Sequence, residues 1–305
     1  MAQLVKRAYK YRFHPTPEQA EELVRTFGCV RLVYNKALEE RTRAYTEEGR
    51  GVSYTESSAA LTLAKMGAPL DIVWSRPLPE GAEPSTVTVS RDAAGRWFVS
   101  LLVEEKIAPL PPVERSTGVD TGLTALLTLS CGEQIANPRH ERRERRRLAK
   151  AQRALARKQK GSNNRAKARL KVARVHARIA DRRRDYLHKV TTRLVRENQV
   201  IAQVIAVEDL AVRNLLKNHA LARAISDAGW RELRRMLEYK TDWYGRTLAV
   251  ADRFFPSSKL CSVCGTLQET LPLSVRVWVC ACGAVHDREV NAARNMLLAA
   301  GLAES

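Results

Sequence analysis

The opening of the chain alternates apolar and polar positions, which predicts a β-rich region. Residues 4–13 alternate well enough for one strand, and residues 86–90 and 96–103 predict two more around a turn at 92–95. Residues 108–112 contain three prolines and have neither helical nor central-strand character, so they predict a linker. The first hundred or so residues are therefore expected to form a small domain of their own.

A helix is predicted directly after the first strand. Thr16 is a typical N-cap, Pro17 suits the first turn, and Gln19 stands three residues after the cap. Apolar residues then recur at helical spacing and form a stripe that we expect to pack in a core. Residues 1–112 are therefore expected to form a β-rich domain with a helical insertion.

A second, α/β pattern begins after the linker. Residues 116–130 predict a strand that turns back at 131–132, and two long helical patterns follow at 138–160 and 165–198. A buried strand is predicted next, at 200–207. Strands that alternate with helices in this way are typical of an α/β domain.

The strand at 200–207 carries a tandem repeat of four residues, 199–202 and 203–206. Four is an even shift, so either copy presents the same side chains to the same face of a sheet. The extra copy can lengthen the preceding loop, or it can place Gln203 at an apolar position. The pattern alone leaves both outcomes open.

The amount and distribution of positive charge indicate that the chain binds nucleic acid. The 305 residues hold 52 Lys and Arg against 33 Asp and Glu, a net charge of +19, and residues 139–189 alone contribute 21 basic and four acidic residues. Solvated helices normally balance their charges, and these do not, so we expect them to bind phosphates. The side chains expected to touch phosphates are Arg142, Arg146, Arg153, Lys160 and Arg169.

Other classes of protein find no support in the sequence. No secretory signal is visible at the start, and no apolar run approaches the ~20 residues of a membrane span. Four of the six cysteines cluster near the C-terminus, which suits a metal site in a reducing cytoplasm better than a set of disulfides. Cys29 falls in the first predicted helix and is expected to be a small core residue. No serine-nucleophile or phosphate-loop motif is present.

Three carboxylates stand where strands end or helices begin. Asp120 lies between Gly118 and Gly122, Glu208 closes a buried apolar strand, and Asp287 precedes a helical pattern. A buried acid is costly unless it meets a cation or hydrogen bonds. A pair of divalent metal ions would relieve the repulsion among three such acids and activate water for attack on a phosphodiester. Mg²⁺ is the expected ion because it prefers carboxylate oxygens.

The clustered cysteines predict a zinc ribbon. Cys261 and Cys264 have the spacing of a zinc knuckle, and a second pair, Cys280 and Cys282, follows after fifteen residues. Only one residue separates the two cysteines of the second pair, whereas two residues separate those of the first. Four thiolates on one Zn²⁺ are the expected ligand set.

His286 is an alternative fourth ligand, should the shortened pair fail to present both sulfurs. The simpler interpretation, which we favour, places this histidine beside the site without a ligand role. In either case the ribbon precedes Asp287 in sequence and is expected to brace that end of the active site.

Three segments resemble the RuvC motifs of TnpB proteins, which bacterial insertion elements encode and which are related to the type V CRISPR nucleases. The segments are 118–122, 205–210 and 286–295. The resemblance runs from about residue 137 to the C-terminus nearly without a break. Three further segments are also similar to that family: 178–185, 226–230 and 255–259.

The resemblance implies an RNase H-like (RuvC) nuclease domain in which Asp120, Glu208 and Asp287 bind Mg²⁺ and catalyse hydrolysis. It also implies a guide RNA and a double-stranded DNA target as partners, a monomeric ribonucleoprotein, and a place in the bacterial cytoplasm at the nucleoid. DNA strand transfer is not expected. The implied regions are a wedge with a reduced recognition insertion (1–112), the first part of the nuclease domain (113–255), a zinc ribbon (256–285) and the last nuclease motif (286–305).

The chain departs from the family before its catalytic domain. In similar proteins a long, basic helical stretch separates the counterparts of residues 53–57 and 70–74, whereas about a dozen residues do so here. Most of the recognition region is therefore expected to be missing. This leaves two alternatives to a guided nuclease: a guided DNA-binding protein that does not cut, and a nuclease or RNA-binding protein that uses no guide.

Overall fold

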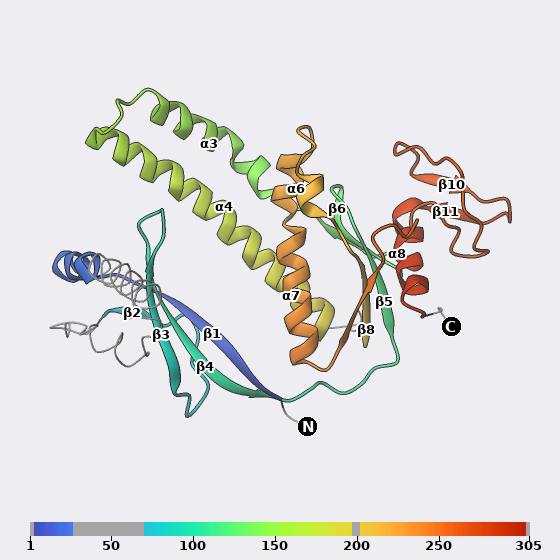
Figure 1. The fold of residues 1–305 in the computed structure, drawn as a ribbon, viewed down its shortest axis with the longest axis horizontal. Helices are drawn as coiled ribbons and strands as arrows, with labels where there is room; N and C mark the ends of the chain where they lie inside the picture. Colours follow the sequence, from blue (N-terminus) through green and yellow to red (C-terminus); the bar gives the residue numbers. More distant parts are fainter. Residues whose placement is uncertain (1–2, 27–69, 197–201, 303–305) are drawn as a thin grey trace, which may run out of the picture. The chain divides into compact units, whose positions relative to one another are not determined.

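The computed structural model describes residues 3–26, 70–196 and 202–302 (Figure 1). The chain divides into two compact units, Lys6–Glu104 and a larger one formed by Met1–Val5 with Glu105–Ser305. Cys29 and residues 53–69, on which the sequence carried expectations, lie outside the described residues. None of the described helices combines the length and the apolar character needed to cross a bilayer.

The smaller unit is built on an antiparallel sheet with the strand order β2-β1-β4-β3. Its turn between β3 and β4 uses Gly95 at φ +78°, and the Asp92 carboxylate accepts a hydrogen bond from the Arg96 amide at 2.9 Å. The three predicted strands and their turn are thus confirmed. The strands are β1 (Gln3–Phe13), β2 (Ile72–Val73), β3 (Pro84–Arg91) and β4 (Trp97–Ile107).

The predicted helix start after β1 is also confirmed. The Thr16 amide donates to Gln19 Oε1 at 3.0 Å, and the Gln19 amide donates to Thr16 Oγ1 at 3.2 Å. This reciprocal pair satisfies two amides that no helical carbonyl can reach. Helical geometry follows over residues 17–26, where Leu23 packs on the sheet with Phe13.

The larger unit contains a mixed sheet with the strand order β7-β6-β5-β8-β9. β7, β6 and β5 are antiparallel neighbours, whereas β5, β8 and β9 run parallel. This sheet, with helices on both faces, fits the RNase H-like fold that the sequence resemblance implies. The strands are β5 (Ser116–Thr121), β6 (Ala125–Leu129), β7 (Gln134–Ala136), β8 (Val204–Glu208) and β9 (Thr247–Ala251).

One strand prediction was wrong. Residues 116–130 form two strands instead of one, because the chain turns at Gly122, whose amide donates to the Leu126 carbonyl at 3.2 Å. A Cβ at position 122 would lie 2.9 Å from the Ala125 carbonyl oxygen, so the turn needs glycine. The apolar pattern continues through both strands, and periodicity therefore does not reveal the turn.

Helices cover both faces of this sheet (Figure 1). The C-terminal half of α4, together with α6 and α7, packs a large apolar core on one face, and α8 packs on the other face against β5, β8 and β9. Gly118 permits the second contact, because a Cβ there would lie 1.8 Å from the Ala293 carbonyl oxygen. The helices are α3 (His140–Ala156), α4 (Asn163–Arg196), α5 (Val212–Leu215), α6 (Ala222–Ala228), α7 (Trp230–Trp243) and α8 (Arg288–Ala299).

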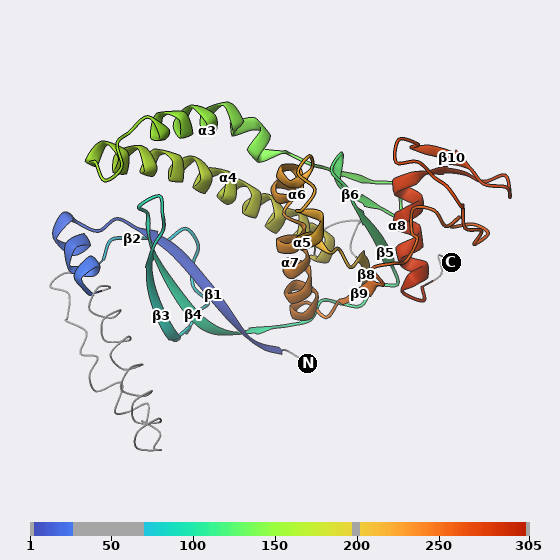
Figure 2. The same ribbon diagram turned by 45° about the horizontal axis from the view of Figure 1, so that its top comes forward.

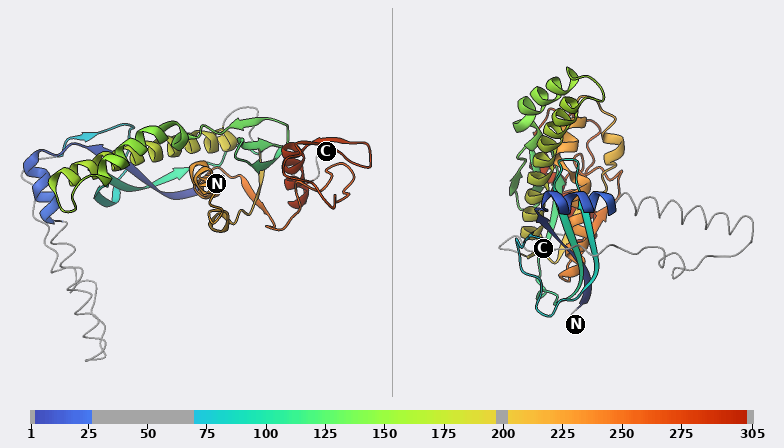
Figure 3. Two further views of the ribbon diagram at one scale, coloured as in Figure 1. Left: turned by 90° about the horizontal axis from the view of Figure 1, so that it is seen from above. Right: turned by 90° about the vertical axis from the view of Figure 1, so that its left-hand side faces the viewer.

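The two basic helices form an antiparallel hairpin, as Figures 1 and 3 show. The N-terminal half of α4 packs against α3 through a small cluster of Leu148, Val175 and Ile179. The C-terminal half of α4 belongs to the core of the sheet through Leu187 and Leu194. The predicted helices are therefore confirmed. The helix α4 therefore joins the sheet to a basic arm, which consists of α3 and the N-terminal half of α4.

The second copy of the tandem repeat supplies strand β8, which pairs in register with β5 and β9. Gln203 stands just before the strand, and its amide accepts a hydrogen bond from Arg246 at 2.9 Å and donates one to the Gly245 carbonyl at 2.9 Å. Both ends of the amide are thus satisfied, so Gln203 carries no cost of an unpaired polar group. Residues 199–201 of the first copy lie outside the described residues.

Candidate active site and metal centre

Two of the predicted acids lie side by side on neighbouring strands. β5 and β8 are parallel, and their register pairs Val119 with Val207. Asp120 is therefore level with Glu208, and both follow the face on which Gly118 meets α8. Both side chains are partly buried.

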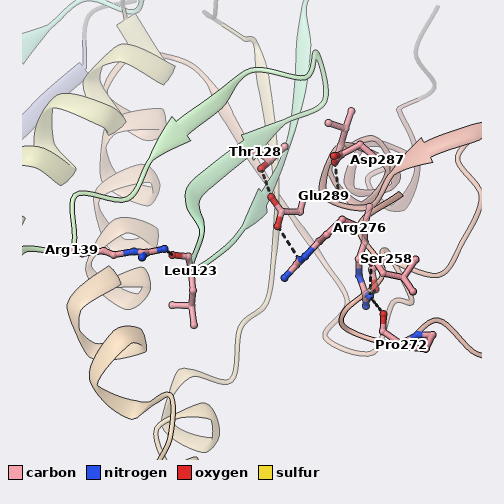
Figure 4. Close-up of polar contacts among 11 residues, drawn as sticks. Leu123, Thr128, Arg139, Ser258, Pro272, Arg276, Asp287 and Glu289 are labelled. Carbon is pink, nitrogen blue, oxygen red and sulfur yellow. Dashed lines mark hydrogen bonds and ion pairs between the residues drawn. The ribbon is translucent and has the colours of Figure 1, made fainter. Parts of the chain in front are cut away.

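The third predicted acid, Asp287, caps α8. Its Oδ1 accepts hydrogen bonds from the amides of Glu289 at 3.0 Å and Val290 at 2.9 Å (Figure 4). A carboxylate is favoured here because it meets unpaired amides and the positive end of the helix. Asp287 is exposed, unlike Asp120 and Glu208.

A fourth acid, Glu289, escaped the sequence analysis. Figure 4 shows its carboxylate between Thr128 and Arg276, accepting from Thr128 Oγ1 at 3.4 Å and pairing with Arg276 Nη1 at 3.2 Å. Thr128 is the cross-strand partner of Asp120, so Glu289 reaches the strand pair that carries this aspartate. The available signal was its place two residues after Asp287, in the first turn of the same helix.

The electrostatics indicate that these acids crowd one another. Burial raises the pKa of Asp120 to about 8, with further contributions from Glu208, Glu289 and Asp287 that are opposed by Arg288. Burial and the charge of Asp209 also raise the pKa of Glu208. Of the two acids at the start of α8, Glu289 raises the pKa of Asp120 more than Asp287 does.

This donor set fits a divalent cation. Partly buried oxygen ligands that repel one another are stabilised as anions by a metal ion, and hard oxygen donors suit Mg²⁺. Among the described residues, the oxygen atoms of these carboxylates do not form a compact group of ligand atoms. The sulfur atoms of the four cysteines, described below, do form one. The packing of α8 on β5 brings Glu289 and Asp287 close enough to Asp120 for their charges to raise its pKa.

Two arginines connect the acids to their surroundings. Arg288 is buried and donates to the Pro272 carbonyl at 2.7 Å, which ties the start of α8 to the cysteine-bearing segment. Arg139, with φ 49°, donates to the Leu123 carbonyl at 3.2 Å in the turn after Asp120 (Figure 4). The basic arm therefore begins at a contact with the strand pair that carries Asp120.

All four predicted cysteines converge. Their sulfur atoms lie within 4.8 Å of one another, with 3.6 Å between Cys264 and Cys280 and 3.8 Å between Cys261 and Cys282. The shortened second pair thus presents both sulfurs. β10 (Val277–Val279) and β11 (Val285–Asp287) form the hairpin that carries this pair, so a zinc ribbon is compatible with the geometry.

His286 lies beside the cysteines and not among them. Its Nε2 is 3.0 Å from Cys261 Sγ, and its ring stacks on Trp278 with 4.6 Å between centroids. Burial and the charge of Arg294 lower the pKa of this histidine. Contacts with Thr266 lower the pKa of Cys264 to about 6, which favours the thiolate that a metal binds.

The five residues predicted to bind phosphates are exposed on α3, the following turn and α4. None of them forms an ion pair with a described residue, whereas nearby Arg145 and Arg182 pair with Glu141 and Glu144. The unpaired side chains are the ones free to meet an external anion. They are Arg142, Arg146, Arg153, Lys160 and Arg169.

Three family models match successive parts of the chain. A model described as "Probable transposase" (OrfB_IS605) matches residues 99–219, and a Cas12f1-like TNB domain matches residues 230–296. A model described as a helix-turn-helix domain matches residues 1–50, of which the described part is β1 and the start of a helix. Together the matches include the three predicted acids and the four clustered cysteines.

A relative from Streptomyces pristinaespiralis decides the family. It is named "Putative RNA-guided DNA endonuclease" and is 58% identical over an alignment that spans all of this chain and 92% of the relative. The chain belongs to the TnpB-type family. This alignment has 373 positions and the chain 305 residues, so at least 68 positions of the relative have no counterpart here.

More distant relatives agree. "Putative RNA-guided DNA endonuclease InsQ" of Escherichia coli K12 is 38% identical over 70% of this chain and 56% of its own length. A solved structure titled "Cryo-EM structure of the Cas12f1-sgRNA-target DNA complex" matches 85% of this chain and 50% of its own, with a TM-score of 0.52 and 13% identity. The chain thus spans about half the length of these two proteins, and the second likeness concerns the fold alone.

The raised pKa of Asp120 leads to a testable prediction about stability. Its folded-state pKa, about 8, lies above the ordinary value of 3.8, so the folded protein holds a proton that the unfolded chain has lost. Without magnesium, stability should fall as pH rises from about 4 to about 8. We expect Asp120→Asn to be more stable than the wild type at pH 8.5 by at least about 1 kcal/mol, with a smaller gap at pH 5.5.

Urea unfolding in magnesium-free buffer at the two pH values measures this difference. Added Mg²⁺ should stabilise the wild type at pH 8.5 and leave Asp120→Asn nearly unchanged. Equal gaps at both pH values would show that Asp120 ionises normally in the folded protein.

Proposed function

We propose that this chain is an RNA-guided DNA endonuclease that hydrolyses phosphodiester bonds with a magnesium-bound acidic site. The observation that carries the proposal is the meeting of Asp120 and Glu208 on adjacent strands with the acids of α8. The names of its relatives support the guided activity. An insertion-element origin follows from the family.

Asp120, Glu208 and Asp287 are the proposed metal ligands and catalytic residues. Bound Mg²⁺ would neutralise their charge and activate water for attack on the phosphate. Glu289 stands on the same turn as Asp287 and can supply the third carboxylate, since Asp287 already accepts two helix amides. Arg276 and Thr128 hold Glu289 in place beside Asp120.

The four cysteines are the proposed ligands of a structural Zn²⁺, Cys261, Cys264, Cys280 and Cys282. Their sulfur atoms already converge, and a zinc site closed by four thiolates has no open position for chemistry. His286, at 3.0 Å from Cys261, would orient this sulfur.

Guide RNA and target DNA are the proposed partners, with residues 1–112 acting as a wedge that holds the RNA. Base pairing would supply sequence recognition, while the protein holds the duplex by its backbone. The basic arm of α3 and α4 offers unpaired charges for that purpose. The particle is expected to be one protein chain with one RNA, in the bacterial cytoplasm.

The first prediction concerns guided cutting of a plasmid with Mg²⁺ and RNA transcribed from the same locus. Asp120→Ala and Glu208→Ala should each slow cutting at least about a hundredfold, because each removes a charge that stabilises the metal and the reacting phosphate. We expect Glu289→Gln to slow cutting at least as much as Asp287→Asn. Rates are read from the loss of supercoiled plasmid.

Glu133→Ala is the matched control, since this acid pairs with Arg193 on the sheet away from the carboxylate cluster. Retained target binding by Asp120→Ala would show that the RNA complex is intact. A wild type that binds its target and never cuts would support the alternative of a guided binding protein.

A second prediction concerns the salt dependence of nucleic-acid binding. Replacing Arg142, Arg146, Arg153, Lys160 or Arg169 with Ala should lower the slope of log affinity against log salt by about one for each phosphate that the side chain neutralises. Arg182→Ala is the control, because Glu144 already neutralises that side chain at 2.8 Å. Binding titrations at several salt concentrations give the slopes. Affinity that does not change with salt would exclude phosphate binding by the arm.

A third prediction concerns zinc. The purified protein should carry about one Zn²⁺ per chain. Cys264→Ser and Cys282→Ser should lose it, whereas Cys131→Ser, at an exposed free cysteine, should keep it. Elemental analysis measures the metal, and Trp278 fluorescence reports the ribbon because this ring packs beside the cysteines. Full zinc content in Cys282→Ser would point to His286 as the fourth ligand.

A further inference from the structure

A cavity of about 640 Å³ opens beside Glu208, on the face of the sheet opposite α8. This volume lies within the range of natural ligand sites. Its walls come from the ends of β5 and β8 and from α5 and α7, which lie together in Figure 2. Of the proposed catalytic residues only Glu208 lines it, at its edge, since Gly118 and Asp120 belong to the other face of β5.

The floor of the cavity is apolar and rigid. Its side chains belong to the main core of the sheet, so they form a preformed surface rather than a mobile loop. A flat aromatic group would bury apolar area there. The floor residues are Val119, Leu127, Val207, Leu233 and Leu237.

Two polar groups in the lining have no hydrogen-bond partner. Thr121 Oγ1 and Trp230 Nε1 are both buried and unpaired among the described residues. Unpaired buried donors are rare and costly, and a ligand with acceptor atoms would satisfy them. Thr121 directly follows Asp120 in β5, so one of these groups is adjacent in sequence to the acidic site.

The rim of the cavity supplies positive charge. Arg253 pairs with Asp209 at 2.5 Å and Arg234 pairs with Glu238 at 2.9 Å, which neutralises both of those acids. Arg213 and Arg231 are exposed and form no ion pair with a described residue. The rim therefore retains two cations next to an apolar floor.

A second cavity, of about 710 Å³, continues this rim toward the basic arm. The two cavities share Trp230, Arg231 and Arg234, and the second one extends to Arg183 and Arg184 of α4. A single strand of nucleic acid could follow this path, because it offers phosphates at regular spacing and bases with two apolar faces.

We propose that the cavity beside Glu208 binds one nucleobase of the DNA strand that is cut, with Arg213 and Arg231 holding the flanking phosphates. The proposal rests on the proposed nuclease function. A base has apolar faces for the floor and acceptor atoms for Thr121 and Trp230, and its sugar carries a phosphate on each side. Glu208 lies in the lining, so holding one base would fix the position of the adjacent phosphate relative to Glu208.

The direct test uses a trinucleotide whose central base is fluorescent 2-aminopurine, with full-length protein in magnesium-free buffer. The trinucleotide should bind about tenfold more tightly than its copy with an abasic centre, because enclosing one base contributes about 1–3 kcal/mol. Ala211→Phe fills the cavity from its edge, and it should reduce the difference to about twofold or less.

Ala224→Phe is the matched control. It adds the same ring at an exposed alanine of α6 that lines neither cavity, and it should keep the tenfold difference. An equal effect of the abasic centre on wild type and Ala211→Phe would overturn the proposal. Neither a guide RNA nor cutting is needed, so a failure of the nuclease function would leave this result standing.

A second experiment places the base relative to the cut. Single abasic nucleotides are introduced at successive positions around the cleavage site of a guided target. One position should slow cutting by about tenfold in the wild type and have little added effect in Ala211→Phe, since the two changes remove the same interaction. A uniform effect at every position, or full additivity, would mean that no single base is held.

Discussion

The candidate active site depends on one close contact, the approach of α8 to β5 at Gly118. No side chain separates the two backbones, since a Cβ at this position would lie 1.8 Å from the Ala293 carbonyl oxygen. This packing brings the first turn of α8 to the level of Asp120, and β8 brings Glu208 from the other side. Acidic residues from three distant parts of the sequence thus lie on one face of the sheet or beside it, because two elements can touch without a side chain between them.

The same contact creates a cost that the rest of the fold must offset. Burial, together with the neighbouring acids, raises the pKa of Asp120 to about 8, which means that ionising it in the folded protein is unfavourable. Apolar clusters lie on both sides of the sheet, with Leu129 and Leu194 on one face and Met296 and Leu297 on the other. These cores hold together an arrangement that its charges oppose. A bound cation would remove this opposition.

Sequence predicted the residues whose surroundings are local. The Thr16 capping box, the cysteine pairs and the acids at strand ends each sit in a short pattern with a physical meaning. Glu289 was missed because its role depends on Thr128, a residue far away in sequence that faces Asp120 only once β5 and β6 have paired. The turn at Gly122 was missed for a similar reason, since apolar residues continue on both sides of it. The cavity beside Glu208 is formed by several separate elements, β5, β6, β8, α5 and α7 among them, and leaves no signal in any one of them.

Hydrogen bonds and an ion pair connect the cysteine ribbon to α8, which carries Glu289 and is capped by Asp287. Asn295 donates to the carbonyls of Ser257 at 2.7 Å and Leu260 at 2.6 Å, which fixes α8 to the entry of the ribbon. Arg276 reaches from the ribbon to Glu289, and Arg288 returns from α8 to the ribbon. A disturbance at the cysteines would therefore move the start of α8, where both of its acids lie. The cysteine cluster and the start of α8 are thus connected in space as well as in the order of the sequence.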